Sequence, residues 1–105
     1  MAQWSDDRIL ANGIHIHYTR TGGNKPPLLL LHGFTDSGLC WTPLGKVLEQ
    51  DYDVIMPDAR GHGLSDGPES GFSPKQRADD VAGLIQELAL DQPRVLGHSM
   101  GAATA

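Results

Sequence analysis

A serine with glycine two residues before it and two residues after it is the part of this chain best suited to chemistry. The segment reads Gly97-His98-Ser99-Met100-Gly101, and it follows a short apolar run. This Gly-x-Ser-x-Gly pattern between a strand and a helix is typical of a sharp turn that exposes a nucleophilic serine. Residues two before and two after such a serine approach other backbone too closely to carry side chains. We therefore predict that Ser99 is a catalytic nucleophile and that Gly97, His98 and Gly101 shape its turn.

A second segment could stabilise the negative charge that attack by a serine creates. His32-Gly33-Phe34 comes directly after the longest aliphatic run of the chain. A loop at that place can present the backbone N–H of Phe34 toward Ser99. Together with the N–H of Met100 it would form an oxyanion hole with two donors. We predict Phe34 and Met100 as these donors, with His32 and Gly33 shaping the loop.

The strands that must position these motifs are visible as apolar patterns. Apolar and polar residues alternate strictly over Ile14–Thr19, as they do in a strand with one covered face. Asn12-Gly13 lies between this segment and a first strand near 9–11 and is a strong hairpin signal. Leu28–Leu31 is unbroken and suits a strand that is buried on both faces. Two further short runs, 54–56 and 94–96, are expected to be buried strands.

Two helices are expected between these strands. Thr42-Pro43 reads as an N-cap followed by a proline at the first helical position, and this helix should end near Gln50. Ser73 and Gln76 form a capping box for the second helix, with Pro74 in its first turn. The apolar stripes expected to face the core are Trp41, Leu44, Val47 and Leu48 in the first helix and Val81, Ala82, Ile85, Leu88 and Ala89 in the second.

This order of elements predicts a single α/β domain over residues 1–105, with a mostly parallel sheet, an N-terminal antiparallel hairpin and flanking helices. The chain has 105 residues, a net charge of -5 and only eight Lys and Arg, which are scattered, so nucleic acid is not expected as a partner. No apolar run is long enough to span a membrane, and no secretory signal is visible. Cys40 is the single cysteine, which excludes an intrachain disulfide and favours a cytoplasmic protein with a small buried thiol at this position.

A third motif, Asp58-Ala59-Arg60-Gly61-His62-Gly63-Leu64-Ser65, follows the middle strand. These three motifs, each after its strand, resemble the α/β-hydrolase superfamily over residues 14–105. The resemblance implies the N-terminal half of an α/β-hydrolase fold from the cofactor-free branch of small esterases, carbon–carbon bond hydrolases and haloperoxidase-like perhydrolases. It also implies that Asp58, Arg60 and His62 mostly brace the floor of the site. Epoxide hydrolases and haloalkane dehalogenases of this family carry aspartate as the nucleophile, so Ser99 argues against those activities.

The family's catalytic triad continues after the serine with an acid and then a histidine. None of the six residues after Ser99 can act as an acid or a base, so the chain is expected to be a partial domain truncated just after the nucleophile turn. His62 is the better candidate for a base within the chain, although bracing its loop is the favoured role. His98 should point away from its neighbour Ser99. In the family's strand order, 94–96 would be an exposed sheet edge, open to self-association or to a complementing strand.

Two functions remain open at this point. The first is a serine hydrolase that acts on a small ester or related carbonyl substrate through an acyl-enzyme at Ser99. The alternative is a non-catalytic relative that binds a ligand or a partner in the same place. Neither function requires a cofactor or a metal, and the expected partner is a small-molecule substrate without a role for membranes.

The other polar residues are expected to be structural. His15 and His17 share one strand face and are interpreted as solvated rather than as metal ligands. The acidic pairs and clusters, Asp6-Asp7, Asp79-Asp80 and residues 49–53, are interpreted as exposed charge. Ser37 and Ser65 are expected in turns or caps. Phe34, Trp41 and Met100 could line an acyl pocket, although a tryptophan on an apolar helix stripe, as Trp41 is, more often belongs to the core.

Overall fold

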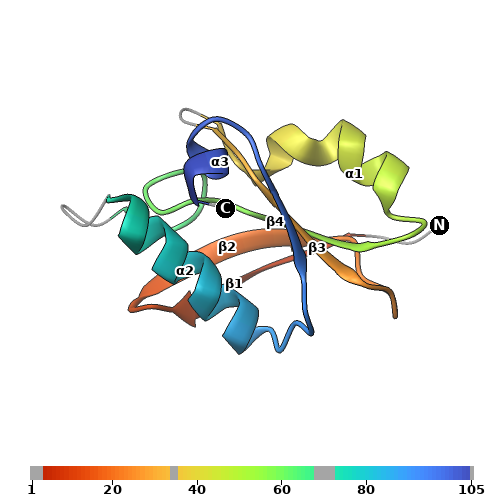
Figure 1. Ribbon diagram of the computed structural model, residues 1–105, viewed down its shortest axis with the longest axis horizontal. Helices are drawn as coiled ribbons and strands as arrows, with labels where there is room; N and C mark the ends of the chain where they lie inside the picture. The colour runs from red at the N-terminus through yellow and green to blue at the C-terminus, as the bar shows by residue number, and fades with distance from the viewer. Residues whose placement is uncertain (1–3, 34–35, 68–72, 105) are drawn as a thin grey trace.

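A five-stranded sheet forms the centre of the structure, a computed structural model that describes residues 4–33, 36–67 and 73–104 (Figure 1). Its strands lie in the order β1-β2-β4-β3-β5. Their bounds are Ser5–Ala11 for β1, Ile14–Arg20 for β2, Pro27–Leu31 for β3, Asp53–Pro57 for β4 and Arg94–Gly97 for β5. β2 pairs antiparallel with β1 and β4, whereas β3 pairs parallel with β4 and β5. The predicted α/β fold class with an N-terminal antiparallel hairpin is confirmed, and the sheet is mixed, with two antiparallel and two parallel pairings.

The hairpin turn forms where the sequence predicts it. Asn12 and Gly13 both have positive φ angles, 51° and 82°, as a tight two-residue hairpin turn requires. Ala11 is paired with Ile14 across this turn, and the ladder continues to Ser5 and Arg20. β1 therefore begins several residues before the apolar run that predicted it.

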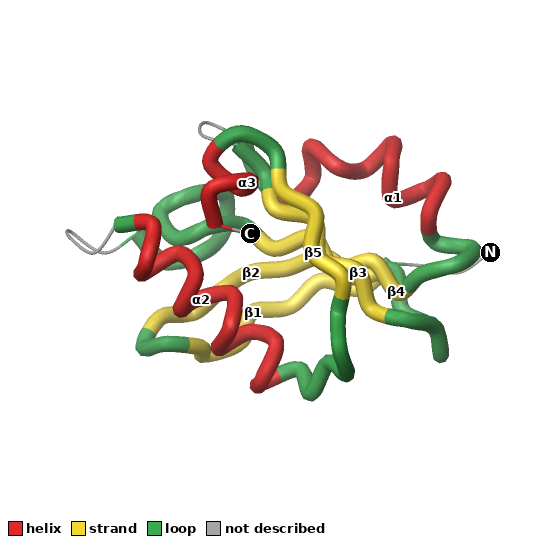
Figure 2. Tube along the Cα trace, in the orientation of Figure 1, coloured by secondary structure: helices red, strands yellow, loops and turns green. Residues whose placement is uncertain are grey.

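The aliphatic run in β3 is buried on both faces of the sheet, as expected. Leu29 joins a core cluster beneath α2 (Pro74–Glu87), and its neighbours Leu28 and Leu30 join a second cluster beneath α1 (Thr42–Leu48). The two helices therefore cover opposite faces, an arrangement that can be followed in Figure 2. Alternation of side chains along a strand explains why an unbroken run of leucines is needed between two helical layers.

The capping box of α2 is confirmed in full. The Ser73 hydroxyl accepts a hydrogen bond from the Gln76 N–H at 3.2 Å, and the Gln76 side chain accepts one from the Ser73 N–H at 3.1 Å. The predicted apolar stripe is confirmed in part, because Val81, Ile85 and Leu88 pack against the core cluster. Leu84, which the prediction omitted, is 1% exposed at the centre of the core, whereas Ala82 and Ala89 are exposed.

The first helix differs from its prediction at its start and on one face. A short 3-10 helix, η1 (Gly38–Trp41), leads directly into α1, so Thr42 is the first residue of α1 and Trp41 occupies the cap position. The Thr42 hydroxyl instead donates to the Leu39 carbonyl at 2.7 Å. Val47 was expected in the core but is 70% exposed, because the face of α1 that packs on the sheet carries Leu44 and Leu48.

The burial of Asp80, Asp53 and Cys40 also differs from what the sequence predicts. Asp80 is buried because it accepts hydrogen bonds from Arg60 at 2.6 and 2.7 Å and from the Asn12 side chain at 2.9 Å. Asp53 is buried with Arg20, which donates to it from two nitrogens. Both carboxylates were wrongly assigned to exposed clusters, since burial of a charge is tolerated when it is paired. Cys40, expected as a buried thiol, is exposed.

β5 forms an open edge of the sheet within the described residues. It pairs with β3 on one side and is the last strand in the order. Val95 and Leu96 are 39% and 46% exposed there, so this strand is not buried as its composition suggested. The exposed edge that the family's strand order predicted is present. The opposite edge strand, β1, begins Ser5-Asp6-Asp7-Arg8, and such charges discourage pairing with other chains.

Neither a candidate metal cluster nor a membrane-spanning helix is found in the described ranges. No group of three or more His, Cys, Asp or Glu side chains there could hold a metal ion, and no helix is long and apolar enough to cross a bilayer.

The open edge of β5 leads us to expect self-association of the 105-residue chain through this strand. Substitution Val95→Lys should shift sedimentation toward the monomer, because a lysine on an edge strand opposes pairing. The matched control is Leu10→Lys, which places the same charge at a 56% exposed leucine on the other edge strand and should leave association unchanged. A wild-type chain that sediments as a monomer at high micromolar concentration would contradict this expectation.

Candidate active site

Ser99 lies in a sharp turn between β5 and the short helix α3 (Met100–Thr104). Its φ angle is +56°, in the left-handed region that non-glycine residues rarely adopt. A conformation of this kind costs on the order of 1–3 kcal/mol and is held in place by the surrounding structure. The turn leaves Ser99 exposed, so its hydroxyl is accessible from solvent.

The two glycines of the motif occupy places where a side chain cannot fit. A Cβ at Gly97 would overlap the Gly101 carbonyl, and a Cβ at Gly101 would overlap the carbonyl of Leu31 in β3. The steric requirement that the motif implies is thus met at both positions. α3 consequently begins in direct contact with the end of β3, and this contact sets the place of Ser99 above the sheet.

The loop after β3 reaches the serine. A Cβ at Gly33 would lie 3.3 Å from the Ser99 Cβ and 3.3 Å from Nδ1 of His98, so the backbone of Gly33 lies directly beside the nucleophile turn. Phe34, predicted as an oxyanion donor, lies outside the described residues. The second predicted donor, the N–H of Met100, makes no hydrogen bond to any described residue.

His32 holds this loop through both of its ring nitrogens. Nδ1 lies 2.6 Å from the Gly33 carbonyl and Nε2 accepts a hydrogen bond from the Ala59 N–H at 3.0 Å. These partners require a neutral ring with its proton on Nδ1. Burial lowers the pKa of His32 from its ordinary value, and the hydrogen bond to Gly33 only partly opposes this effect.

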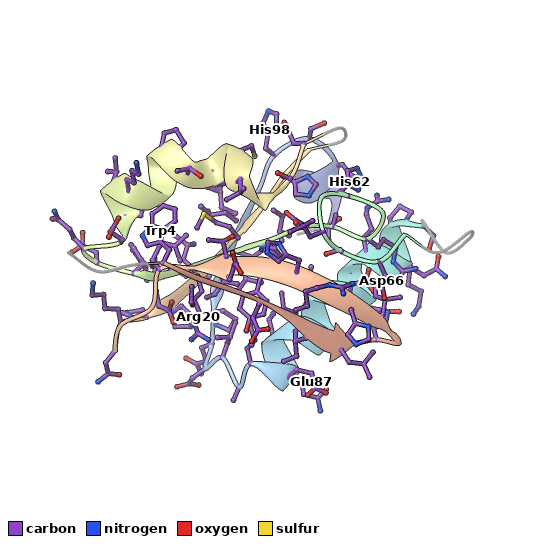
Figure 3. All side chains as sticks on the ribbon, turned by 180° about the vertical axis from the view of Figure 1, so that it is seen from behind. Trp4, Arg20, His62, Asp66, Glu87 and His98 are labelled. Atoms are coloured by element: carbon purple, nitrogen blue, oxygen red, sulfur yellow. The ribbon has the colours of Figure 1, made fainter. Side chains whose placement is uncertain are left out.

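The two histidines considered as bases lie at the end of the molecule where β5 leads into α3 (Figure 3). Nδ1 of His62 is 2.9 Å from the Arg60 carbonyl, and its ring packs against the ring of His32 with centroids 5.1 Å apart. These contacts agree with a bracing role for His62. His98 is exposed beside Gly33.

Two of the three residues suggested for an acyl pocket, Met100 and Trp41, are not brought together, and the third, Phe34, lies outside the described residues. Met100 lines a largely apolar cavity between the sheet, α2 and α3, with neighbours such as Ile16 and Leu84. Trp41 packs against the core cluster on the opposite face of the sheet, beneath α1. A shared pocket formed by Met100 and Trp41 is therefore wrong, and Trp41 is a core residue.

Sequence reasoning missed the burial of His17. It was interpreted as solvated together with His15, but only His15 is exposed, and His17 lies 2.8 Å from the buried Asp58 carboxylate. The loop after β4 packs against His17 through Asp58 and Ser65, whereas His15 on the same strand face stays exposed. Ser65, expected only in a turn, accepts from the His17 N–H and donates to the Asp58 carbonyl. No local sequence pattern signals these contacts between distant segments.

The environment of His32 generates a prediction for the pH dependence of stability. Its pKa is lowered in the folded chain, so the unfolded chain binds a proton at this residue first as the pH falls below about 6.5. The free energy of unfolding should therefore fall as the pH decreases from 7 to 5, with a slope of at most about 1.4 kcal/mol per pH unit from this residue. Denaturant unfolding should show a shallower pH dependence for His32→Gln, and identical slopes would contradict the prediction.

Comparison with known proteins identifies the family. Residues 26–105 match the family model described as alpha/beta hydrolase fold. The chain is 43% identical over 83 residues to the 2-(acetamidomethylene)succinate hydrolase of Mesorhizobium japonicum, covering 79% of this chain and 30% of that protein. It is 38% identical over 98 residues to the soluble epoxide hydrolase of Corynebacterium sp., covering 93% of this chain and 34% of that protein. It is 38% identical over 98 residues to the N-formylmaleamate deformylase of Pseudomonas putida, covering 92% of this chain and 37% of that protein.

The solved structures agree with this match. The crystal structure of E-2-(acetamidomethylene)succinate hydrolase superposes with a TM-score of 0.92 at 36% identity, over 97% of this chain and 38% of that one. The chain spans about a third of the length of the curated relatives it matches. Its sheet order, its strained serine turn and its sequence lead to one conclusion: the chain belongs to the alpha/beta hydrolase fold family.

Proposed function

We propose that Ser99 is the nucleophile of a serine hydrolase that acts on a small ester or related carbonyl substrate. The observation that carries the proposal is the exposed serine at a φ of +56°, with the backbone of Gly33 against it. Strained backbone conformations of this kind cluster at active sites, where a side chain must be presented to a reactant. The named hydrolases among the relatives support the reaction class.

In the proposed reaction the Ser99 oxygen forms a bond to the substrate carbonyl carbon and gives its proton to a base. The carbonyl oxygen becomes negatively charged and is stabilised by the N–H groups of Phe34 and Met100. The tetrahedral intermediate then expels the leaving group, which takes up a proton, and water cleaves the acyl-enzyme. His32 and Gly33 contribute by holding the loop that leads to Phe34.

The chemistry of a serine nucleophile favours a carbonyl substrate over an epoxide. Attack of a serine oxygen on an epoxide carbon forms an ether, which has no carbonyl for water to attack, so the enzyme could not turn over. Attack on a carbonyl forms an ester, which water can cleave. The deformylase among the relatives, named for an N-formyl compound, is compatible with this chemistry, and we propose no epoxide hydrolase activity.

A base must take the proton of Ser99. His62 and His98 are the histidines considered for this role; the contacts of His62 favour bracing of its loop, and His98 is exposed beside Gly33. A serine without a positioned base is a weak nucleophile, but an oxyanion hole alone retains part of the rate enhancement. The cytoplasm remains our proposed location, on the composition of the sequence.

A fluorophosphonate probe should label the folded chain slowly at Ser99. Because the probe reacts with the serine oxygen, Ser99→Ala should abolish labelling, as measured by intact mass and peptide mapping. Ser37→Ala is the matched control, since Ser37 makes no side-chain cap hydrogen bond and lies outside the nucleophile turn. This control should label at the wild-type rate.

Free imidazole should accelerate the labelling, because it can act as a base from solution. We expect a rate that rises with imidazole concentration in the wild type and in Ser37→Ala, with no labelling of Ser99→Ala. Folded wild-type protein that stays unlabelled at high imidazole would overturn the nucleophile role. It would favour the alternative of a relative that binds a ligand or partner without catalysis.

A further inference from the structure

One buried carboxylate connects three segments of the chain behind the candidate site. Asp58, which follows β4, is 4% exposed. Its Oδ1 accepts a hydrogen bond from the Gly38 N–H at 2.6 Å, and its Oδ2 accepts one from the Leu64 N–H at 2.9 Å. Nδ1 of His17 in β2 lies 2.8 Å from the same Oδ2. A buried carboxylate is stable only when such donors satisfy it.

The backbone around this carboxylate is shaped to approach it closely. Gly63 has a φ of +49°, and a Cβ there would overlap the Asp58 carboxylate. A Cβ at Gly38 would overlap the Met56 carbonyl in β4. Both glycines let a loop lie against the end of β4, so the three contacts of Asp58 form without displacing the sheet.

The segment that contains Phe34 is attached on both sides to the end of β4. At its start, His32 accepts a hydrogen bond from the Ala59 N–H. At its end, the Gly38 N–H donates to Asp58, the residue before Ala59. Two consecutive residues after β4 therefore fix both described ends of the loop whose backbone lies beside Ser99.

The ring of His17 has an unusual set of contacts. Its side chain is 7% exposed, yet its Nε2 has no hydrogen-bond partner among the described residues. A buried polar atom without a partner is destabilising, and an apolar side chain at this position would avoid that cost. A histidine at this position can donate a hydrogen bond from Nδ1 to Asp58, whereas a leucine has no donor.

We propose that His17 is a positioning residue for the candidate active site. Its Nδ1–H fixes the Asp58 carboxylate, which in turn holds Gly38 and Leu64 and so sets the loop beside Ser99. The catalytic part of this inference rests on the proposed function, whereas the effect on the loop does not.

Two amide variants distinguish the ring nitrogens. Asparagine places its amide nitrogen where Nδ1 of a histidine lies, and glutamine places its amide nitrogen near the position of Nε2. We expect His17→Gln to speed amide hydrogen exchange at Gly38 and Leu64 by about tenfold or more, because the hydrogen-bonded carboxylate loses its side-chain donor. His17→Asn should retain the exchange rates of the wild type. His15→Gln, on the exposed histidine of the same strand, is the control and should change neither amide.

The exchange rate at Thr21, whose N–H donates to Val54 in the sheet, reports on unfolding of the whole chain. Faster exchange at Gly38 and Leu64 with an unchanged rate at Thr21 supports local positioning by His17. Equal acceleration at all three amides overturns it. Exchange rates at Gly38 and Leu64 that stay at the wild-type level in His17→Gln but rise in His17→Asn also overturn it.

The same variants test the catalytic part of the proposal. Fluorophosphonate labelling with imidazole should show a lower limiting rate for His17→Gln, with the half-saturating probe concentration little changed and the rate restored in His17→Asn. Wild-type protein that is never labelled contradicts the proposed function, while the exchange measurements still decide the role of His17. Normal labelling of His17→Gln with normal exchange at Gly38 overturns the positioning role and leaves the proposed function standing.

Discussion

The contact between the start of α3 and the end of β3 is the constraint on which the candidate site depends. Gly101 lies against the Leu31 carbonyl and Gly97 lies against the Gly101 carbonyl, so no side chain fits at either position. This close approach forces the chain to reverse within the residues between them, and Ser99 adopts a left-handed conformation as a result. The strain at the serine is thus a consequence of how tightly helix and strand meet.

The sheet places the loops of the site at one end because its central strands are parallel. β3, β4 and β5 run in the same direction, so the segments that follow them emerge at the same end of the sheet, where these strands have their carboxyl ends. The loop after β4 then holds the loop after β3 through Asp58 and Ala59. The loop after β4 has hydrogen bonds of its own, such as that from the Gly61 N–H to the Asp66 carbonyl at 2.7 Å, and the loop after β3 is joined to it through Asp58 and Ala59.

The sequence predicted the features that local patterns encode. The leucine run of β3, the Asn12-Gly13 turn and the capping box at Ser73 all depend on residues near one another in the chain, and they are present. The paired burial of Asp80 with Arg60 and of His17 with Asp58 was not predicted, because each pair joins separate elements. Val47 was misplaced because the face of α1 that packs on the sheet carries Leu44 and Leu48.

The order in which strands pair has a consequence for how the site forms during folding. β1 and β2 are joined by a two-residue turn, whereas Leu28 in β3 pairs with Arg94 in β5 from near the other end of the chain. Contacts between residues so distant in sequence carry a large loop-closure entropy and are made slowly. The hairpin can therefore form early, and the serine turn, which needs β5 docked on β3, assembles late. The turn that holds Ser99 therefore exists only in chains in which β5 has already docked on β3.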